Sequence, residues 1–183
     1  MVSNAPLTST EDRVHLCDVL FNKLGASHVF LADAAVLTSY VNGRLTSLVI
    51  EFGQETVYLV PVVNGYAKAE RIVRIENSDP KTLIGSSELA DAIVKVANGE
   101  SELITSIVLG GTPAETADAR KKIEESLNGK VEGAKAYSTL AAGTSAFCGG
   151  SLLACMKEFP AMRLTKEEFE GKRDEVVSKK FFP

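Results

Sequence analysis

The chain has 183 residues, of which 45% are hydrophobic and 24% are charged, a composition typical of one compact domain. Its formal net charge of -4 argues against a nucleic-acid-binding protein, which normally presents a basic face. No apolar run approaches the ~20 residues that a membrane-spanning helix requires, and the first residues lack the pattern of a secretory signal. Three cysteines without paired spacing are typical of free thiols in a reducing compartment, so we expect a cytoplasmic protein.

Helical patterns dominate the first forty residues, after an irregular lead-in. Thr10 is expected to cap a helix whose apolar residues recur at spacings of three and four, and Gly25 is expected to end it. Residues 28–32 are a candidate buried strand. Residues 33–42 then predict an Ala-rich helix that Gly43 ends.

The densest β signal in the chain lies at residues 44–75. Three runs rich in β-branched and aromatic residues predict an antiparallel meander. The runs are residues 48–50, 56–63 and 72–75. Asn64 and Gly65 form the strongest turn signal, because both tolerate positive φ.

The rest of the chain alternates predicted helices with short predicted strands. The helices are residues 87–97, 114–127 and 146–159, and the strands are residues 106–109 and 135–139. Thr165 and Glu168 have the spacing of a capping box for one more short helix, and residues 176–182 read as an apolar-tipped tail.

From residue 44 onward the element order is β-β-β-α-β-α-β-α. Three antiparallel strands followed by two strands reached through helices predict a mixed five-stranded sheet with helices on both faces. The expected fold class is therefore α/β, in a single domain over residues 1–183, with the element order of a ribonuclease-H-like fold.

Several segments of the chain resemble actins, and they do so in the order in which actins carry them. The segments are residues 35–44, 60–67, 107–112, 149–154 and 164–169. The resemblance extends over residues 4–75 and 104–182. It implies an actin-like ATPase fold in which residues 44–139 correspond to the third subdomain of actin, and residues 4–43 and 140–183 to part of the first. It also implies a miniature member, lacking the first phosphate-binding hairpin and the large insertion that residues 76–103 replace.

The resemblance further implies a degenerate nucleotide site. The second phosphate hairpin of actins aligns with Glu51 to Glu55, where Gly53 alone is unchanged and Glu55 replaces a glycine. The water-orienting glutamine of the family falls on Ala34 and its histidine on Tyr58. The vestigial site comprises Glu51, Gly53, Gln54, Gly110 and Gly111, and we expect no hydrolysis, no catalytic residue and no cofactor.

These positions have ordinary structural interpretations as well. Glu51 and Glu55 are either a residual cation site or two solvated acids at a hairpin tip. Gly110 and Gly111, with Thr112, either contact an adenosine or form a strand-to-helix turn.

Other chemistry-bearing residues lack partners in the sequence. His15 and His28 have no companion ligands, so no metal site is expected. Cys148 and Cys155 are expected to be core residues on one helix face. Neither Ser145 nor Ser151 shows the partners of a catalytic triad.

The resemblance implies a second functional surface, the hydrophobic cleft at the barbed end of actins. Its positions are Tyr40, Gly43, Leu45, Gly65, Leu152, Leu153, Met156 and Met162, all apolar, aromatic or small. An exposed apolar cleft usually marks an interface, and a partner's amphipathic helix is the expected occupant. The alternative is that these side chains fill the protein's own core, with the C-terminal tail over them.

The leading hypothesis is a non-catalytic actin-related adaptor in a cytoskeletal assembly, such as an axonemal (ciliary or flagellar) or motor-associated complex. A chromatin-remodelling complex is a further candidate assembly. No self-filament is expected. The alternatives are one half of a split actin-like ATP switch that another chain completes, and a free module that sequesters helices. Fold analogy does not choose among them.

Overall fold

The computed structural model describes residues 1–139 and 141–181. Its strands are β1 (Val2–Asn4), β2 (His28–Val29), β3 (Leu31–Asp33), β4 (Ser47–Phe52), β5 (Thr56–Val63), β6 (Tyr66–Ala67), β7 (Val73–Glu76), β8 (Ile107–Gly110), β9 (Ala136–Tyr137) and β10 (Leu164–Thr165). Its α-helices are α1 (Thr10–Asp18), α2 (Ala34–Val41), α3 (Ser87–Ala97), α4 (Ser101–Ile104), α5 (Ala119–Ser126), α6 (Ser145–Ala154), α7 (Phe159–Met162), α8 (Lys166–Gly171) and α9 (Arg173–Lys180).

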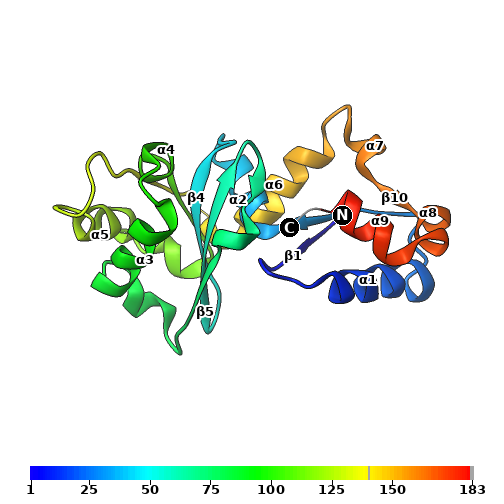
Figure 1. Ribbon diagram of the computed structural model, residues 1–183, viewed down its shortest axis with the longest axis horizontal. Helices are drawn as coiled ribbons and strands as arrows, with labels where there is room; N and C mark the ends of the chain where they lie inside the picture. The colour runs from blue at the N-terminus through cyan, green and yellow to red at the C-terminus, as the bar shows by residue number, and fades with distance from the viewer. Residues whose placement is uncertain (140, 182–183) are drawn as a thin grey trace.

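The molecule is elongated and has two lobes (Figure 1). The large-sheet lobe contains β4 to β9 with α3, α4 and α5. The small-sheet lobe contains β1, β2, β3 and β10 with α1, α8 and α9. Helices α2 and α6 lie between the lobes and pack against each other.

The large sheet is mixed, as the sequence predicts, but it has six strands rather than five. The order is β6-β5-β4-β8-β9. Strands β6 and β7 both pair with the edge of β5 that faces away from β4, β7 along the first half of β5 and β6 at its end. β4 is antiparallel to β5 and parallel to β8. The additional strand arises because Asn64 and Gly65, at φ of 53° and 84°, fold the chain back at once and form β6 beside the end of β5.

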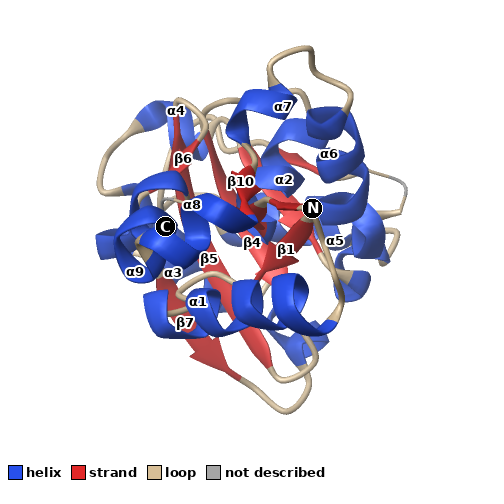
Figure 2. Cartoon of the chain, turned by 90° about the vertical axis from the view of Figure 1, so that its right-hand side faces the viewer, coloured by secondary structure: helices blue, strands red, loops and turns tan. Residues whose placement is uncertain are grey.

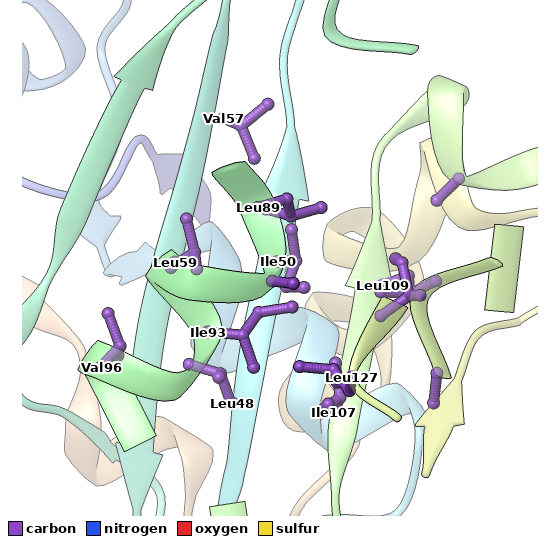
Figure 3. Packing of buried hydrophobic residues seen from close by; sticks show 14 of the residues in the cluster. Leu48, Ile50, Val57, Leu59, Leu89, Ile93, Val96, Ile107, Leu109 and Leu127 are labelled. Atoms are coloured by element: carbon purple, nitrogen blue, oxygen red, sulfur yellow. The ribbon is translucent and has the colours of Figure 1, made fainter. Parts of the chain in front are cut away.

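Helices cover both faces of this sheet, which confirms the expected α/β architecture. Along β4, Leu48 and Ile50 face the core beneath α3 and α5 (Figure 3). Val49 faces the opposite side, where it packs with Ala35 of α2. The period-2 alternation of a strand buried on both faces explains why this segment reads as a continuous apolar run.

The small-sheet lobe has its own aromatic core. The rings of Phe21 and Phe169 lie 5.3 Å apart, and the ring of Phe30 lies 5.5 Å from those of Phe159 and Phe181. The single strand expected at residues 28–32 is wrong in detail. It divides into β2, which pairs antiparallel with β10, and β3, which pairs parallel with β1.

Several helix boundaries differ from the predicted ones. Ser9 rather than Thr10 caps α1, because the Ser9 hydroxyl accepts the N–H of Asp12 at 3.0 Å. The predicted helix at 114–127 begins only at Ala119, since Thr112–Glu115 forms a 3-10 turn. The helix expected to reach residue 159 ends at Ala154. The C-terminal tail is largely helical and forms α9. Residue 182 of the predicted tail lies outside the described residues, and so do residues 140 and 183 of the predicted range 140–183.

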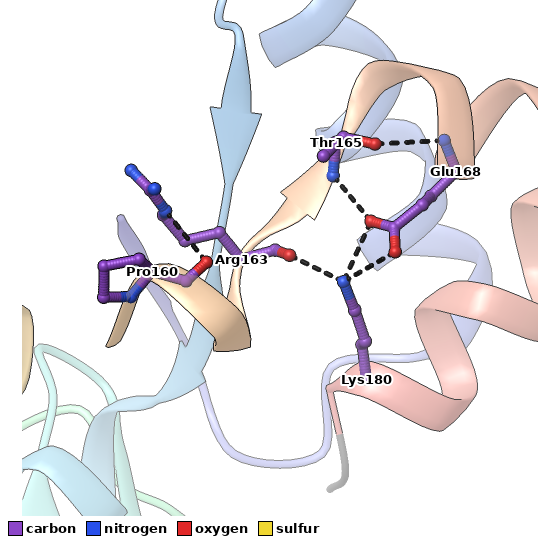
Figure 4. Close-up of polar contacts among 5 residues, drawn as sticks. All are labelled: Pro160, Arg163, Thr165, Glu168 and Lys180. Carbon is purple, nitrogen blue, oxygen red and sulfur yellow. Dashed lines mark hydrogen bonds and ion pairs between the residues drawn. The ribbon is translucent and has the colours of Figure 1, made fainter. Parts of the chain in front are cut away.

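The predicted capping box forms and also anchors the last helix (Figure 4). The N–H of Thr165 donates to Glu168 Oε2 at 2.9 Å, and the N–H of Glu168 donates to Thr165 Oγ1 at 3.2 Å. Lys180 Nζ donates to the same carboxylate at 2.9 Å and to the carbonyl of Arg163 at 2.6 Å. The end of α9 is thereby tied to the segment that follows α7.

Candidate functional site

An apolar groove of about 460 Å³ opens where the end of α2, the loop after it, the end of α6 and α7 meet. It is lined by Tyr40, Gly43, Arg44, Leu45, Leu152, Leu153, Met156 and Met162. Seven of the eight positions that the resemblance predicted therefore lie together. They come from segments more than a hundred residues apart in the chain, which only the packing of α2 on α6 brings together.

Local backbone chemistry places these side chains. Gly43 adopts φ of +69°, and its N–H donates to the carbonyl of Tyr40 at 2.9 Å, so α2 ends and the chain turns to present Leu45. On the other side, a Cβ at Gly149 would overlap the carbonyl of Leu37. That close approach brings the end of α6, with Leu152 and Leu153, against the end of α2.

The groove is open rather than filled. Leu45 is 64% exposed, Leu152 55%, Met156 50% and Met162 37%, whereas Leu153 is only 6% exposed and belongs to the core of the small-sheet lobe. The alternative that these positions form an ordinary core is therefore wrong for four of them. Among tail residues 176–181, none lines the groove either, and Phe181 packs on Phe30.

Gly65, the eighth predicted residue, lines an adjoining hollow of about 360 Å³ instead, together with Tyr40, Leu153 and Met162. The Tyr40 hydroxyl donates to the Gly65 carbonyl at 3.2 Å, and a Cβ at Gly65 would lie 2.8 Å from that oxygen. Burial, with a smaller contribution from Tyr66, raises the pKa of Tyr40. Gly65 thus contributes to the groove indirectly, because its lack of a side chain leaves room for the Tyr40 hydroxyl.

Arg44 lines the groove and was not predicted. Its guanidinium lies over the ring of Tyr137, 3.6 Å from the centroid, and Nη1 donates to Ser106 Oγ at 3.0 Å. These contacts hold the only charged side chain among the lining residues against β8 and β9. No local sequence signal marks Arg44, because both of its partners are distant in the chain.

The residues of the expected vestigial nucleotide site lie near one another, where β4 and β8 end side by side and Glu51 pairs with Gly110. Gln54 and Glu55 are exposed in the tight turn between β4 and β5, where the N–H of Gly53 donates to the carbonyl of Thr56 at 2.8 Å. Gly111 has φ of +89°, and a Cβ there would overlap the carbonyl of Phe52. Both glycines therefore have a packing or turn role that requires no ligand.

Glu51 is not the solvated hairpin-tip acid that one interpretation expected. Its carboxylate lies so close to Gly110 that a Cβ there would overlap Oε2, and Thr38 Oγ1 donates to the same oxygen at 3.1 Å. Burial raises the pKa of Glu51 to about 7; the hydrogen bond from Thr38 opposes this rise, and the nearby Asp33 adds to it. Burial likewise raises the pKa of Asp33 to about 6. Within residues 1–139 and 141–181, no three His, Cys, Asp or Glu side chains are grouped as metal ligands.

The remaining candidate residues are dispersed. His15 and His28 are exposed. Ser145 is buried and bonds to Thr139 at 2.9 Å. Cys148 and Cys155 are both exposed, so their assignment to the core is wrong; α6 buries its glycine face instead. Across the described parts of the chain, no helix has the length and hydrophobicity needed to cross a membrane.

Comparison with known proteins agrees with this architecture. The family model described as Actin matches residues 1–79 and 70–182. Actin-related protein 2 of Arabidopsis thaliana is 37% identical over 67 residues, which is 37% of this chain and 17% of the relative. Actin-like protein 9 of Mus musculus is 33% identical over 76 residues (42% and 18%), and putative actin-29 of Dictyostelium discoideum 26% over 98 residues (54% and 24%).

Each alignment thus spans less than a quarter of the relative's own length. The family model, by contrast, extends over nearly all of this chain, through both lobes and through every segment that builds the groove. The chain belongs to the actin family.

Proposed function

We propose that this protein is a non-catalytic, actin-related adaptor subunit that binds an amphipathic helix of a partner protein in the apolar groove. The observation that carries the proposal is the groove itself, in which Leu45, Leu152 and Met156 are each at least half exposed. Water-exposed apolar side chains gathered in a concave surface are stabilised by burial against a partner. A helix places residues i, i+3, i+4 and i+7 on one stripe that fits such a groove, and methionine adapts to its shape.

A non-catalytic role is supported by the side chains at the end of β4 and in the turn that follows it, and by Ala34. The Glu51 carboxylate occupies the space next to Gly110, and Glu55 adds a second acid at the turn where the family carries a glycine. Ala34 has no side-chain hydrogen-bonding group with which to orient a water molecule. The negative charge of Glu55 and the space that the Glu51 side chain fills disfavour a bound triphosphate.

The proposed setting is a multi-protein cytoskeletal complex in the cytoplasm, of which axonemal and motor-associated assemblies are examples. Family membership supports a cytoskeletal setting in general. The groove is expected to be covered by another subunit in that complex, because burying its exposed leucines and methionines removes apolar surface from water.

Substitution of Met156, which lines the groove, tests the binding proposal. Met156→Glu introduces a charge among apolar lining residues, so we expect recovery of the native partner from the source cell to fall at least tenfold in a quantitative pull-down. Leu24→Glu is the matched control, because Leu24 is 72% exposed and lies outside the groove. Equal recovery with both variants would contradict the proposal.

Nucleotide calorimetry tests the non-catalytic part. Titration with Mg-ATP should give no binding tighter than about 1 mM, for the isolated chain and for the purified native complex. Micromolar binding that appears only in the complex would instead favour one half of an ATP switch completed by another chain. Micromolar binding to the isolated chain would contradict the proposal directly.

A further inference from the structure

The large sheet has an open edge at β7. Strand β7 lies at the margin of this sheet (Figure 2) and, among the described residues, pairs with β5 alone. The N–H of Asn77, directly after β7, donates to the carbonyl of Glu55 at 3.0 Å, which fixes the direction in which each residue of β7 bonds. Because successive residues of a strand alternate, the N–H and C=O groups of Arg74 and Glu76 project away from β5.

These outward backbone groups are not satisfied within the described chain. No hydrogen bond within residues 1–139 and 141–181 reaches the backbone of Arg74 or Glu76 on the side away from β5. The opposite edge of the sheet differs, because the N–H of Ala136 on β9 is occupied by the carboxylate of Glu124 at 2.8 Å. Edge strands with free N–H and C=O groups are the ones that pair with strands of other chains.

The side chains of β7 alternate between the two faces of the sheet. Val73 and Ile75 are half-buried and pack on the core beneath α3. Arg74 and Glu76 lie on the other face, where their side chains are 51% and 76% exposed and form an ion pair at 3.0 Å. The open edge therefore carries a basic and an acidic side chain with one apolar residue between them.

This order of charges is complementary to itself. When a second copy of β7 runs antiparallel to the first and the two Ile75 residues lie opposite each other, Arg74 of each copy lies opposite Glu76 of the other. Both residues direct their backbone groups outward, so each such pair exchanges both of its N–H···O=C hydrogen bonds. Each pair also places opposite charges directly across the two strands, which stabilises the pairing.

Other registers lack this match. A shift by two residues places Arg74 opposite Arg74 or Glu76 opposite Glu76, and like charges directly opposite each other are destabilising. A shift by one residue places the outward groups of Arg74 opposite Ile75, whose own N–H and C=O bond toward β5. The charges and the backbone therefore favour the same antiparallel register.

We infer that two copies of this protein associate through antiparallel pairing of their β7 strands, which joins the two large sheets into one continuous sheet. The two-fold axis passes between the two Ile75 residues, so the pair is closed and does not extend into a filament. The contact is short and its ion pairs are exposed, so we expect a weak dimer with a Kd of about 100 µM or less. This interface is independent of the groove and of its proposed helical occupant.

Sedimentation velocity of the full chain between about 5 and 500 µM tests the inference, and the parent should pass from monomer to dimer over this range. Arg74→Glu and Glu76→Arg each place like charges opposite each other, so each should raise the Kd at least tenfold. Arg120→Glu, at an exposed position of α5, is the matched charge-reversal control and should leave the Kd unchanged. Circular dichroism checks that every variant is folded.

Mixing the two variants is a sharper test. In an equimolar mixture of Arg74→Glu and Glu76→Arg, every charge again faces an opposite one, so a mixed dimer should form at least as tightly as the parent dimer. In the parent, the Arg74 and Glu76 amides should exchange hydrogen at least twofold more slowly at about 500 µM than at about 5 µM. The Asn77 amide, which bonds to Glu55, should exchange at the same rate at both concentrations.

Four outcomes would each overturn the inference. They are a parent that stays monomeric, single reversals that dimerise as the parent does, a mixture that stays monomeric, and edge amides whose exchange does not depend on concentration. Met156→Glu should leave dimerisation intact. A dimer that this variant abolishes would be formed through the groove, and this too would overturn the inference.

Discussion

Glu51 is an acid whose surroundings favour its neutral form, and this makes the stability of the protein depend on pH. Its folded-state pKa of about 7 exceeds its ordinary value of 4.5, so ionisation costs free energy in the folded state as pH rises between these values. We expect Glu51→Gln to raise the free energy of unfolding at pH 8 by about 2–3 kcal/mol and to leave it nearly unchanged at pH 4. Urea unfolding at both pH values measures this.

The control for this prediction is Glu55→Gln, because Glu55 is exposed in the adjacent turn. Asp33, with a pKa raised to about 6, adds its own pH dependence over the same range, so the Glu51 variant should reduce the slope without removing it. A variant with the same stability difference between pH 4 and pH 8 as the parent would show that Glu51 ionises without cost.

At the residue scale, the sequence predicted which residues line the groove better than it predicted the surroundings of individual side chains. The groove positions could be predicted because the family resemblance aligned them, and seven of the eight line one surface. The burial of Glu51 could not, since it depends on Thr38 from α2 and on Gly110 from β8. The place of Arg44 depends in the same way on Tyr137, 93 positions later.

Among the elements, α9 is anchored by a single lysine, which provides a matched comparison. Lys180 donates to the Arg163 carbonyl and to Glu168, whereas its neighbour Lys179 is more exposed and reaches only Glu175 on the same helix. We expect Lys180→Met to lower the free energy of unfolding by about 1 kcal/mol and Lys179→Met to change it by less than about 0.5 kcal/mol. Denaturant unfolding of both variants measures this, and equal losses would contradict it.

Elements were predictable where local signals and packing agreed. α3 occupies the predicted residues 87–97, because Ser86 caps its start and Asn98 adopts a left-handed conformation at its end. β6 was missed because two residues carry too little pattern, and α5 was predicted too long because the 3-10 turn at Thr112–Glu115 has a helical composition. The division of residues 28–32 into two strands depends on partners at both ends of the chain.

At the scale of the whole molecule, two apolar cores meet through one helix crossing. The core beneath α3 and the aromatic core of the small-sheet lobe share no residue; α2 packs on the other face of the large sheet through a third, smaller cluster, and α2 and α6 connect the two lobes (Figure 1). Gly149 sets the distance of that crossing, because any side chain there would meet the backbone of Leu37. Cooperative unfolding of the two lobes should therefore depend on this glycine.

We expect the parent protein to unfold in a single calorimetric transition and Gly149→Ala to unfold in two, with the less stable lobe losing about 2 kcal/mol or more. The added methyl group overlaps a carbonyl that belongs to a helix and cannot move aside alone, so the two helices must separate. Gly171→Ala is the control, since a Cβ there meets nothing within 4 Å. The groove lies at the same crossing, so Gly149→Ala should also weaken recovery of the native partner. A single transition at the parent temperature would show that the lobes are coupled through other contacts.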